Sequence, residues 1–185
     1  LVFGNPARLE PLLHDRRLQL VFAGKAHPDD GEGKRIIGNL VRMARTYSHA
    51  VVFVPDYEMG LARHLTRGTD VWLNNPIRPL EASGTSGMKA ALNGVLNLSI
   101  LDGWWPEGCV HGENGWAFGG GSGGEPDQDA HDREALYTVL ENEVMPAYAD
   151  RTRWTTMMRA SAAMAEQQFS SDRMVREYFD RLYAR

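Results

Sequence analysis

The sequence predicts an α/β fold in which a Rossmann-like parallel sheet has helices on both faces and is followed by C-terminal helices. Two patterns support this class. Short apolar runs alternate with amphipathic stretches over the first two thirds of the 185 residues, which is typical of strand–helix–strand units. The last third instead carries apolar residues at helical spacing. The length suffices for a core, and we expect one domain, 1–185, with 131–185 as its C-terminal helices.

Four short apolar runs are predicted to be strands. The clearest is 50–54, a continuous β-branched and aromatic run that is stopped by Pro55. Such a run is typical of a parallel strand whose two faces are both covered. The other predicted strands are 18–23, 69–73 and 95–100.

Helices are predicted between these strands and after them. The first group covers 33–46, 59–65 and 88–92. The alternation of apolar runs and amphipathic stretches stops in 102–129. The glycine run 119–124 in this region predicts a flexible loop. Beyond it an apolar stripe is broken by Pro146, a second helix runs from about 151 to 168, and a third begins at Ser170, whose hydroxyl can cap it. The third helix has an apolar stripe made of Met174, Val175, Tyr178, Phe179, Leu182 and Tyr183.

The composition excludes several classes of partner. Hydrophobic residues make up 43% of the chain and charged residues 24%, and the net charge is -4. The chain therefore lacks the basic footprint of a nucleic-acid-binding protein. No apolar stretch approaches the roughly 18–20 residues that a membrane span requires. The single cysteine, Cys109, cannot form an internal disulfide, which favours a reducing compartment and predicts a cytoplasmic protein.

The first residues predict that this chain is a piece of a longer protein. It opens on Leu1, in the middle of an apolar pattern, rather than on methionine, and it shows no secretory leader.

The strongest chemical signal is a loop of small residues that leads into a predicted helix, with an acid before it and an amine after it. The run is Glu81-Ala82-Ser83-Gly84-Thr85-Ser86-Gly87-Met88-Lys89. Gly84 and Gly87 let the backbone approach a ligand closely, and Thr85 and Ser86 offer hydroxyl and N–H groups where a helix N-terminus favours an anion. An amine within one turn of that anion site suits a cofactor with both a phosphate and an aldehyde.

Two observations bear on the choice between a cofactor site and a plain capped helix with a solvated lysine. On the glycines alone, the capped helix is the better interpretation. Among the 20 basic residues only Lys25, Lys34 and Lys89 are lysines, so chemistry that needs an amine has three side-chain candidates.

The order of residues in 81–89 resembles the pyridoxal-phosphate segment of α-glucan (glycogen, maltodextrin or starch) phosphorylases at nine consecutive positions. The resemblance continues through 90–99 and 101–103 and returns at 24–28, 56–59 and 169–173. The runs 70–76 and 103–105 resemble the shorter bacterial and archaeal branch. Ser86-Gly87 stands where the animal enzymes have Gly-Asn.

The resemblance implies a fold, a reaction and a set of roles. The chain would be the C-terminal domain of a two-Rossmann-domain glycosyltransferase fold, without its N-terminal partner domain. The enzyme would cleave terminal α-1,4-glucosyl units with orthophosphate and give α-glucose 1-phosphate with retention. The implied roles are cofactor attachment by Lys89, binding of the cofactor phosphate by Thr85 and the backbone N–H of Ser86, a place near the cofactor ring for Tyr57, and binding of the transferred glucosyl unit by Glu81 with the backbone of Ala82, Ser83 and Gly84.

Cations are expected to be limiting in this piece. The resemblance implies that basic residues for the substrate phosphate lie upstream of Leu1, and Arg78 is the arginine nearest to Lys89, where it can supply one charge. We therefore expect the piece alone to be inactive. The apolar stripe of the last predicted helix is compatible with a homo-oligomer. Without a partner domain, this stripe must pack on the sheet, swap between chains or stay exposed.

Other candidates are weaker. The run 25–28 follows a strand end, where α/β ligand sites form, although a loop with a surface lysine explains it as well. The histidines have no metal-ligand spacing, so no metal is expected. Trp104, Trp105 and Trp116 can stack on sugar rings or pack in the interior, and packing is favoured.

Two rival functions remain. One is a nucleotide-sugar glycosyltransferase of the glycogen or starch synthase type, which needs no lysine at position 89. The other is a non-catalytic isolated domain.

Overall fold

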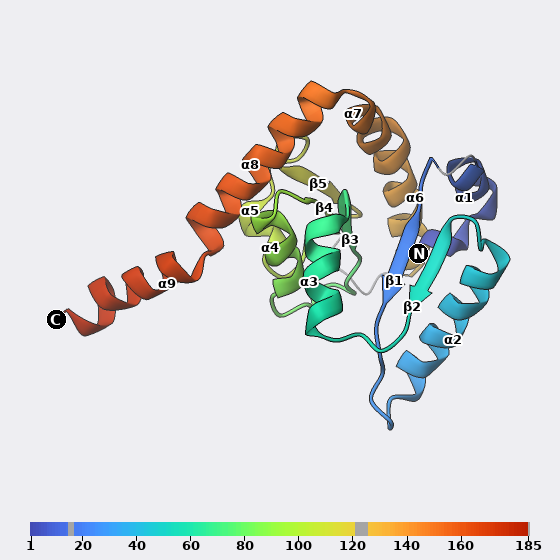
Figure 1. Ribbon diagram of the computed structural model, residues 1–185, viewed down its shortest axis with the longest axis horizontal. Coiled ribbons are helices and arrows are strands. Elements are labelled where there is room, and N and C mark those ends of the chain that lie inside the picture. Colours follow the sequence, from blue (N-terminus) through green and yellow to red (C-terminus); the bar gives the residue numbers. More distant parts are fainter. Residues whose placement is uncertain (15–16, 121–125, 185) are drawn as a thin grey trace. The chain divides into compact units, whose positions relative to one another are not determined.

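The computed structural model describes residues 1–14, 17–120 and 126–184 (Figure 1). The chain divides into two compact units: Val2–Arg63, the N-terminal unit, and His64–Arg185 with Leu1, the C-terminal unit. Each unit has a parallel sheet of its own. The prediction of one domain over 1–185 stays a prediction.

The N-terminal unit is built around one strand–helix–strand arrangement. β1 (Leu20–Ala23) and β2 (Val51–Val54) pair in parallel along their whole length. Both strands were expected from their apolar runs. α1 (Pro6–Leu13), which the sequence patterns did not predict, precedes them and buries three leucines on one face.

The helix that joins these strands confirms the prediction for 33–46 and extends it. α2 runs over Gly31–Thr46. It begins two residues early because the Asp30 side chain accepts a hydrogen bond from the Gly33 N–H at 2.8 Å, which satisfies one of the free donors at a helix start.

The C-terminal unit contains the second sheet and most of the helices. α3 (Met59–Gly68) contains the boundary between the units. The elements after it are β3 (Val71–Asn74), α4 (Thr85–Leu92), β4 (Leu96–Ile100), α5 (Trp105–Gly108), β5 (Gly115–Phe118), α6 (Gln128–Val139), the π-helical turn Leu140–Val144, α7 (Met145–Ala149), α8 (Arg151–Phe169), α9 (Ser171–Tyr178) and the π-helical turn Phe179–Tyr183.

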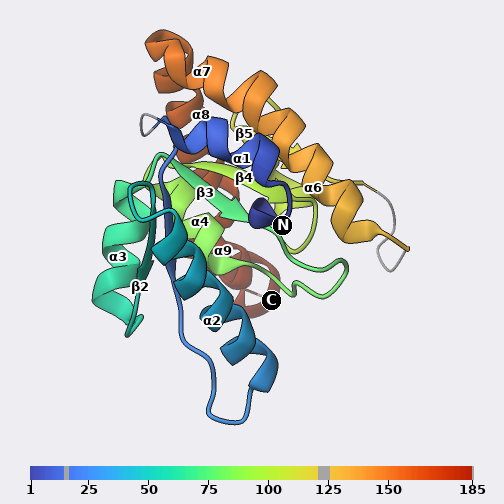
Figure 2. The same cartoon turned by 90° about the vertical axis from the view of Figure 1, so that its right-hand side faces the viewer.

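The sheet of the C-terminal unit has the order β3-β4-β5, and all three strands are parallel. The middle strand, β4, is buried along its whole length. Figures 1 and 2 show α4 and α8 on one side of this sheet and α6 on the other. This part of the chain therefore confirms the predicted class, a Rossmann-like parallel sheet with helices on both faces.

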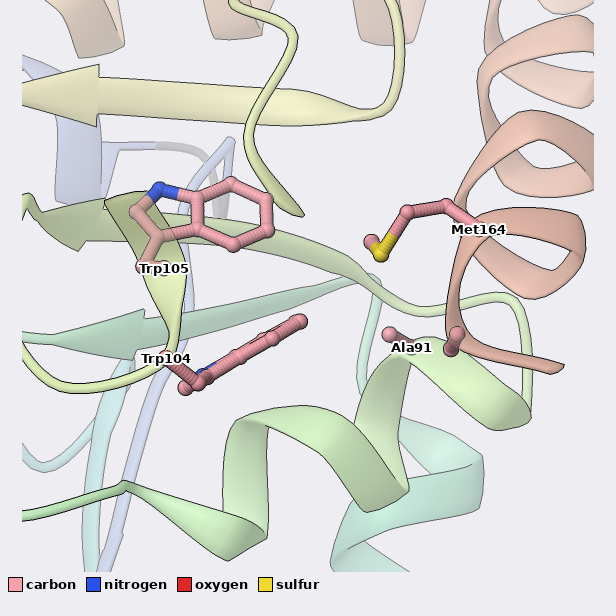
Figure 3. Packing of buried hydrophobic residues seen from close by; sticks show 5 residues of the cluster. Ala91, Trp104, Trp105 and Met164 are labelled. Atoms are coloured by element: carbon pink, nitrogen blue, oxygen red, sulfur yellow. The ribbon is translucent and has the colours of Figure 1, made fainter. Parts of the chain in front are cut away.

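The core on the α4–α8 side is aromatic (Figure 3). Trp104 lies 5.0 Å from Trp105 between ring centroids and 4.9 Å from Phe169, edge to face. These rings pack with Ala91 and Met164 in one buried cluster. Trp116 is also fully buried. The tryptophans therefore pack in the interior, as favoured, and are not exposed platforms for sugar rings.

The region 102–129 contains more structure than its glycines suggest. α5 and β5 both lie in it. β5 was missed because Gly115-Trp116-Ala117-Phe118 has no β-branched residue and is shorter than a usual strand. Gly119 and Gly120 follow it without regular structure, and the remainder of the glycine run lies outside the described residues.

Pro146 was expected to break the apolar helical stripe after the glycine run. In the structure the chain stays helical through Pro146. The chain passes from α6 through a π-helical turn into α7, where Pro146 occupies the first turn. A proline ring collides with the carbonyl four residues earlier in a regular helix, and a wider turn relieves that collision.

α9 begins at Ser171 with Ser170 as its cap, as predicted. In Figure 1 it extends from the end of α8 away from the sheet. Its apolar stripe is exposed rather than packed, with exposed fractions from 48% at Met174 to 69% at Tyr183. None of the helices in the described residues is both long and apolar enough to cross a membrane.

Candidate active site

The predicted cofactor loop becomes the start of α4. The helix begins at Thr85, three residues before the predicted 88–92. Gly84 is its N-cap residue and lies in the left-handed region at φ 85°, where residues with a side chain are strained. Among the residues that the structure describes, no side chain caps this helix start. The small residues of the loop therefore leave the end of the helix open.

The open helix end presents unused hydrogen-bond donors. The Gly87 N–H donates to the Gly84 carbonyl at 3.1 Å. For the N–H groups of Thr85 and Ser86, no acceptor is found within the described part of the chain. Two free donors at the positive end of a helix dipole form a site for an anion such as a phosphate.

Lys89 lies one turn further along the same face. Residues four apart on a helix are neighbours, and both Thr85 and Lys89 are exposed. The opposite face carries Ala90 and Ala91, which are fully buried. The structure thus brings two free N–H donors and an amine to one side of α4.

α4 is held firmly on its buried side. The Asn97 side chain of β4 donates to the Gly87 carbonyl at 3.1 Å in the interior. On α8, the Ser161 hydroxyl donates to the Val95 carbonyl, just after α4, at 3.1 Å. Both contacts link the helix to the elements beneath it.

The residues before α4 are fixed by the chain that follows β4. We call residues 75–84, between β3 and α4, the site loop. One oxygen of Asp102 accepts a hydrogen bond from the Glu81 N–H at 3.0 Å, and the Ser83 carbonyl accepts one from the Trp104 N–H at 2.9 Å. The side chain of Glu81 is half-buried. The predicted substrate-binding residues therefore lie next to the predicted cofactor-binding residues of α4.

The Arg78 side chain is engaged within the C-terminal unit. Its guanidinium donates to both carboxylate oxygens of Asp132, at 3.0 and 3.1 Å, and to the Gly120 carbonyl at 2.6 Å. The side chains of Arg78 and Asp132 are only 9% and 6% exposed. Arg78 is thus a structural cation that holds the site loop to α6, and its guanidinium is already engaged by Asp132 and Gly120.

Tyr57 belongs to the N-terminal unit, so its predicted place near the cofactor ring stays a prediction. Locally it is half-buried and lies just before α3. The neighbouring Glu58 side chain accepts hydrogen bonds from the N–H groups of Gly60 and Leu61 at 2.8 and 2.7 Å. That cap fixes the backbone immediately after Tyr57.

The remaining candidates show no site. Lys25 is exposed after β1, and the Lys34 amine donates to the Pro28 carbonyl. The described residues contain no group of three or more side chains suited to a metal ion. Burial raises the pKa of the Cys109 thiol to about 11, so its thiolate is scarce at neutral pH and Cys109 is a poor nucleophile.

Two residues of this site were not singled out by sequence reasoning: Asp102 and Asp132. Asp102 lies in the run that resembles the phosphorylases, two residues after a predicted strand, where ligand sites of parallel sheets form. That position was an available signal. Asp132 lies in a helix far along the chain, and its pairing with Arg78 is a tertiary contact without a local signature.

The fold places the chain among proteins with Rossmann-like domains. The crystal structure of Anabaena HepE in complex with UDP is similar with a TM-score of 0.68 over 91% of this chain and 42% of that one, at 18% identity. The complex of the same protein with UDP-glucose is similar with a TM-score of 0.62, at 17% identity. At such identities the similarity concerns the fold.

Sequence similarity is more specific. Residues 10–120 match the carbohydrate phosphorylase family. The chain is 47% identical to glycogen phosphorylase of Aquifex aeolicus over 195 residues, and 45% identical to maltodextrin phosphorylase of Thermococcus litoralis over 193 residues. All of this chain is aligned in both cases, with 28% and 23% of those proteins. The chain belongs to the carbohydrate phosphorylase family, and it spans about a quarter of the length of these relatives.

Proposed function

We propose that the protein containing this chain is an α-1,4-glucan phosphorylase that uses pyridoxal phosphate held by Lys89. Its substrates are orthophosphate and a glycogen, starch or maltodextrin chain, and its product is α-glucose 1-phosphate. The observation that carries the proposal is the open start of α4, where Thr85 and Ser86 leave two N–H groups free one turn before Lys89. The names of the relatives, glycogen and maltodextrin phosphorylase, support the substrates.

The described residues fit the cofactor. The N–H groups of Thr85 and Ser86, with the Thr85 hydroxyl, would hold its phosphate, and the exposed amine of Lys89 on the same helix face would hold it through its aldehyde group. When bound, pyridoxal phosphate supplies a phosphate group that can exchange a proton with the substrate phosphate. A side chain at position 84 would instead press on the Trp104 ring, since a Cβ atom there would lie 3.3 Å from it.

The site loop supplies the sugar contacts in this proposal. Glu81 accepts hydrogen bonds from hydroxyls of the glucosyl unit, and the backbone of Ala82, Ser83 and Gly84 contributes further polar contacts. Positive charge develops on the sugar ring as the α-1,4 bond breaks, so a nearby carboxylate stabilises the transition state. The whole protein acts in the cytoplasm, since its one cysteine in this part suits a reducing compartment.

A nucleotide-sugar glycosyltransferase is the rival enzyme. The UDP complexes concern a protein that shares the fold at 17–18% identity. That rival has no use for an amine at Lys89 or for a covalently held aldehyde. An absorption band of bound pyridoxal phosphate therefore separates the two functions.

The test is to identify the lysine that holds the cofactor in the whole protein. Borohydride reduction of the holo-protein, followed by peptide mapping, is expected to find the pyridoxyl mass on Lys89 only. Lys25 and Lys34 are internal controls, and the Lys89→Ala variant should lose both the absorption band and the mass. An adduct on another lysine, or no band in the wild type, would refute the assignment.

A further inference from the structure

We infer that Asp102 is a positioning residue that holds Glu81 and the rest of the sugar-binding segment, 81–84, in its binding conformation. This inference rests on the proposed function. Asp102 lies two residues after the end of β4, the buried middle strand of the sheet. It has no assigned role in substrate or cofactor binding, and its carboxylate is directed at the backbone of the chain.

Each oxygen of the Asp102 carboxylate accepts a different backbone hydrogen bond. Oδ2 accepts from the Glu81 N–H at 3.0 Å, and Oδ1 accepts from the Gly103 N–H at 2.9 Å. Hydrogen bonds to an ionised acceptor are about twice as strong as neutral ones. One side chain therefore joins the site loop to the turn after β4.

A second contact fixes the same two segments two residues further on. The Trp104 N–H donates to the Ser83 carbonyl at 2.9 Å. Trp104 itself is buried against Trp105 and Phe169. The segment 81–83 is thus held at both ends by a turn that is anchored in the core.

The turn also requires close approach of the two backbones. Gly103 has a φ of 58°, and a Cβ atom there would lie 2.5 Å from the Ser83 carbonyl oxygen and 2.9 Å from Cγ of Glu81. The stem of the Glu81 side chain therefore lies against Gly103. With its N–H fixed by Asp102 and its stem against Gly103, Glu81 can direct its carboxylate only in a narrow range.

The cofactor residues are held by other means. Thr85, Ser86 and Lys89 lie on α4, whose buried face and whose contact with Asn97 do not involve Asp102. Loss of the Asp102 carboxylate should therefore disturb the sugar contacts and leave the cofactor in place. A general loss of folding would remove both.

The experiment is a double-mutant cycle of Asp102→Ala and Glu81→Gln in the whole enzyme. Asp102→Ala should lower kcat for phosphorolysis by about 10- to 100-fold, the range expected for one charged hydrogen bond, with cofactor content unchanged. In the Glu81→Gln background, Asp102→Ala should lower kcat by a clearly smaller factor. The effects of two substitutions are not additive when the two residues act as a unit. Full additivity, or loss of the cofactor, would overturn the inference.

Two further variants control for folding and for charge. Asp102→Asn retains the shape and one acceptor oxygen, so it should fold and show a smaller loss than Asp102→Ala. Glu107→Ala removes an exposed carboxylate from α5, close by in sequence, and should behave as the wild type. A wild-type rate in both Asp102 variants would contradict the inference.

Amide hydrogen exchange separates this inference from the proposed function. If the wild-type enzyme shows no phosphorolysis, the proposed function is refuted. The anchoring role is then judged by the exchange of the peptide that contains 81–84. Faster exchange in Asp102→Ala than in Glu107→Ala supports it, and equal exchange in both overturns it.

Discussion

At the scale of single residues, the site depends on which polar groups are already engaged by the protein and which remain free. Asp102 and Arg78 are committed to contacts within the C-terminal unit. The donors of Thr85 and Ser86 remain free within the described residues. Glu81 combines both conditions, because its backbone N–H is fixed while its carboxylate can face a ligand.

Glu81→Gln in the whole enzyme should reduce turnover and leave the cofactor bound. A carboxylate that binds sugar hydroxyls contributes more as positive charge develops on the ring. One charged hydrogen bond is worth about 1.5–3 kcal/mol, or about one to two decades in rate. The measurement is kcat with saturating glucan and phosphate, beside the absorbance of the cofactor. Glu107→Gln is the control, and undiminished turnover in Glu81→Gln would contradict the role.

At the scale of elements, the site loop depends on a helix that lies about fifty residues further along the chain. Arg78 ties the loop to α6 through Asp132. Removing one partner of a buried ion pair strongly destabilises a protein, because the remaining charge stays buried with neither its partner nor water around it. The loop and α6 should therefore lose their structure together.

Arg78→Ala should destabilise the protein by about 3–5 kcal/mol, because Asp132 remains buried as an unpaired charge. The joint replacement Arg78→Met with Asp132→Leu should restore much of that loss. Denaturant unfolding midpoints measure both. Arg35 of α2, paired with Glu32 at the surface, supplies the matched control, and Arg35→Ala should change the midpoint little. Equal effects of Arg78→Ala and Arg35→Ala would show that burial of the pair is unimportant.

The strands and amphipathic helices were predictable because their signals are local. The apolar run that forms β2 and the periodic stripe of α9 depend only on neighbouring residues. The start of α4 was placed too late because Gly84, Ser86 and Gly87 are poor helix formers. The structure begins the helix at Thr85, where packing against β4 and α8 outweighs propensity.

The candidate site was predictable only as a run of residues. The spacing in 81–89 allowed the neighbours on α4 to be anticipated, since Thr85 and Lys89 are one turn apart. The contacts that hold this run in place could not be anticipated. Asp102 and Asp132 reach the site loop across 21 and 54 positions of sequence, and no local pattern records such contacts.

At the scale of the whole molecule, the proposed function makes this chain one part of a larger site. It spans 23–28% of its phosphorylase relatives. In the proposed reaction two phosphate groups lie close together and repel each other, so we expect cations around both. Arg78, the arginine nearest to Lys89 in sequence, is engaged elsewhere. We therefore expect the chain by itself to be non-catalytic.

The purified chain 1–185 should fold and yet form no glucose 1-phosphate from glycogen and phosphate. The parallel sheets with their covering helices account for folding, and the exposed stripe of α9 should cause self-association. Calorimetry, light scattering and a phosphorolysis assay test the three statements. Replacing Phe179 and Leu182 by serine should reduce association without lowering the melting temperature. Measurable phosphorolysis by the chain would overturn the expectation of inactivity.

The close approach of the backbone at Gly103 to Ser83 also limits which missense mutations position 103 can accept. Every missense mutation of a glycine codon adds at least a Cβ atom, and at this position that atom would lie 2.5 Å from the Ser83 carbonyl oxygen. No amino acid other than glycine avoids the overlap. A mutational library intended to alter the sugar preference proposed for this site would therefore gain by keeping the Gly103 codon fixed and by placing its diversity elsewhere.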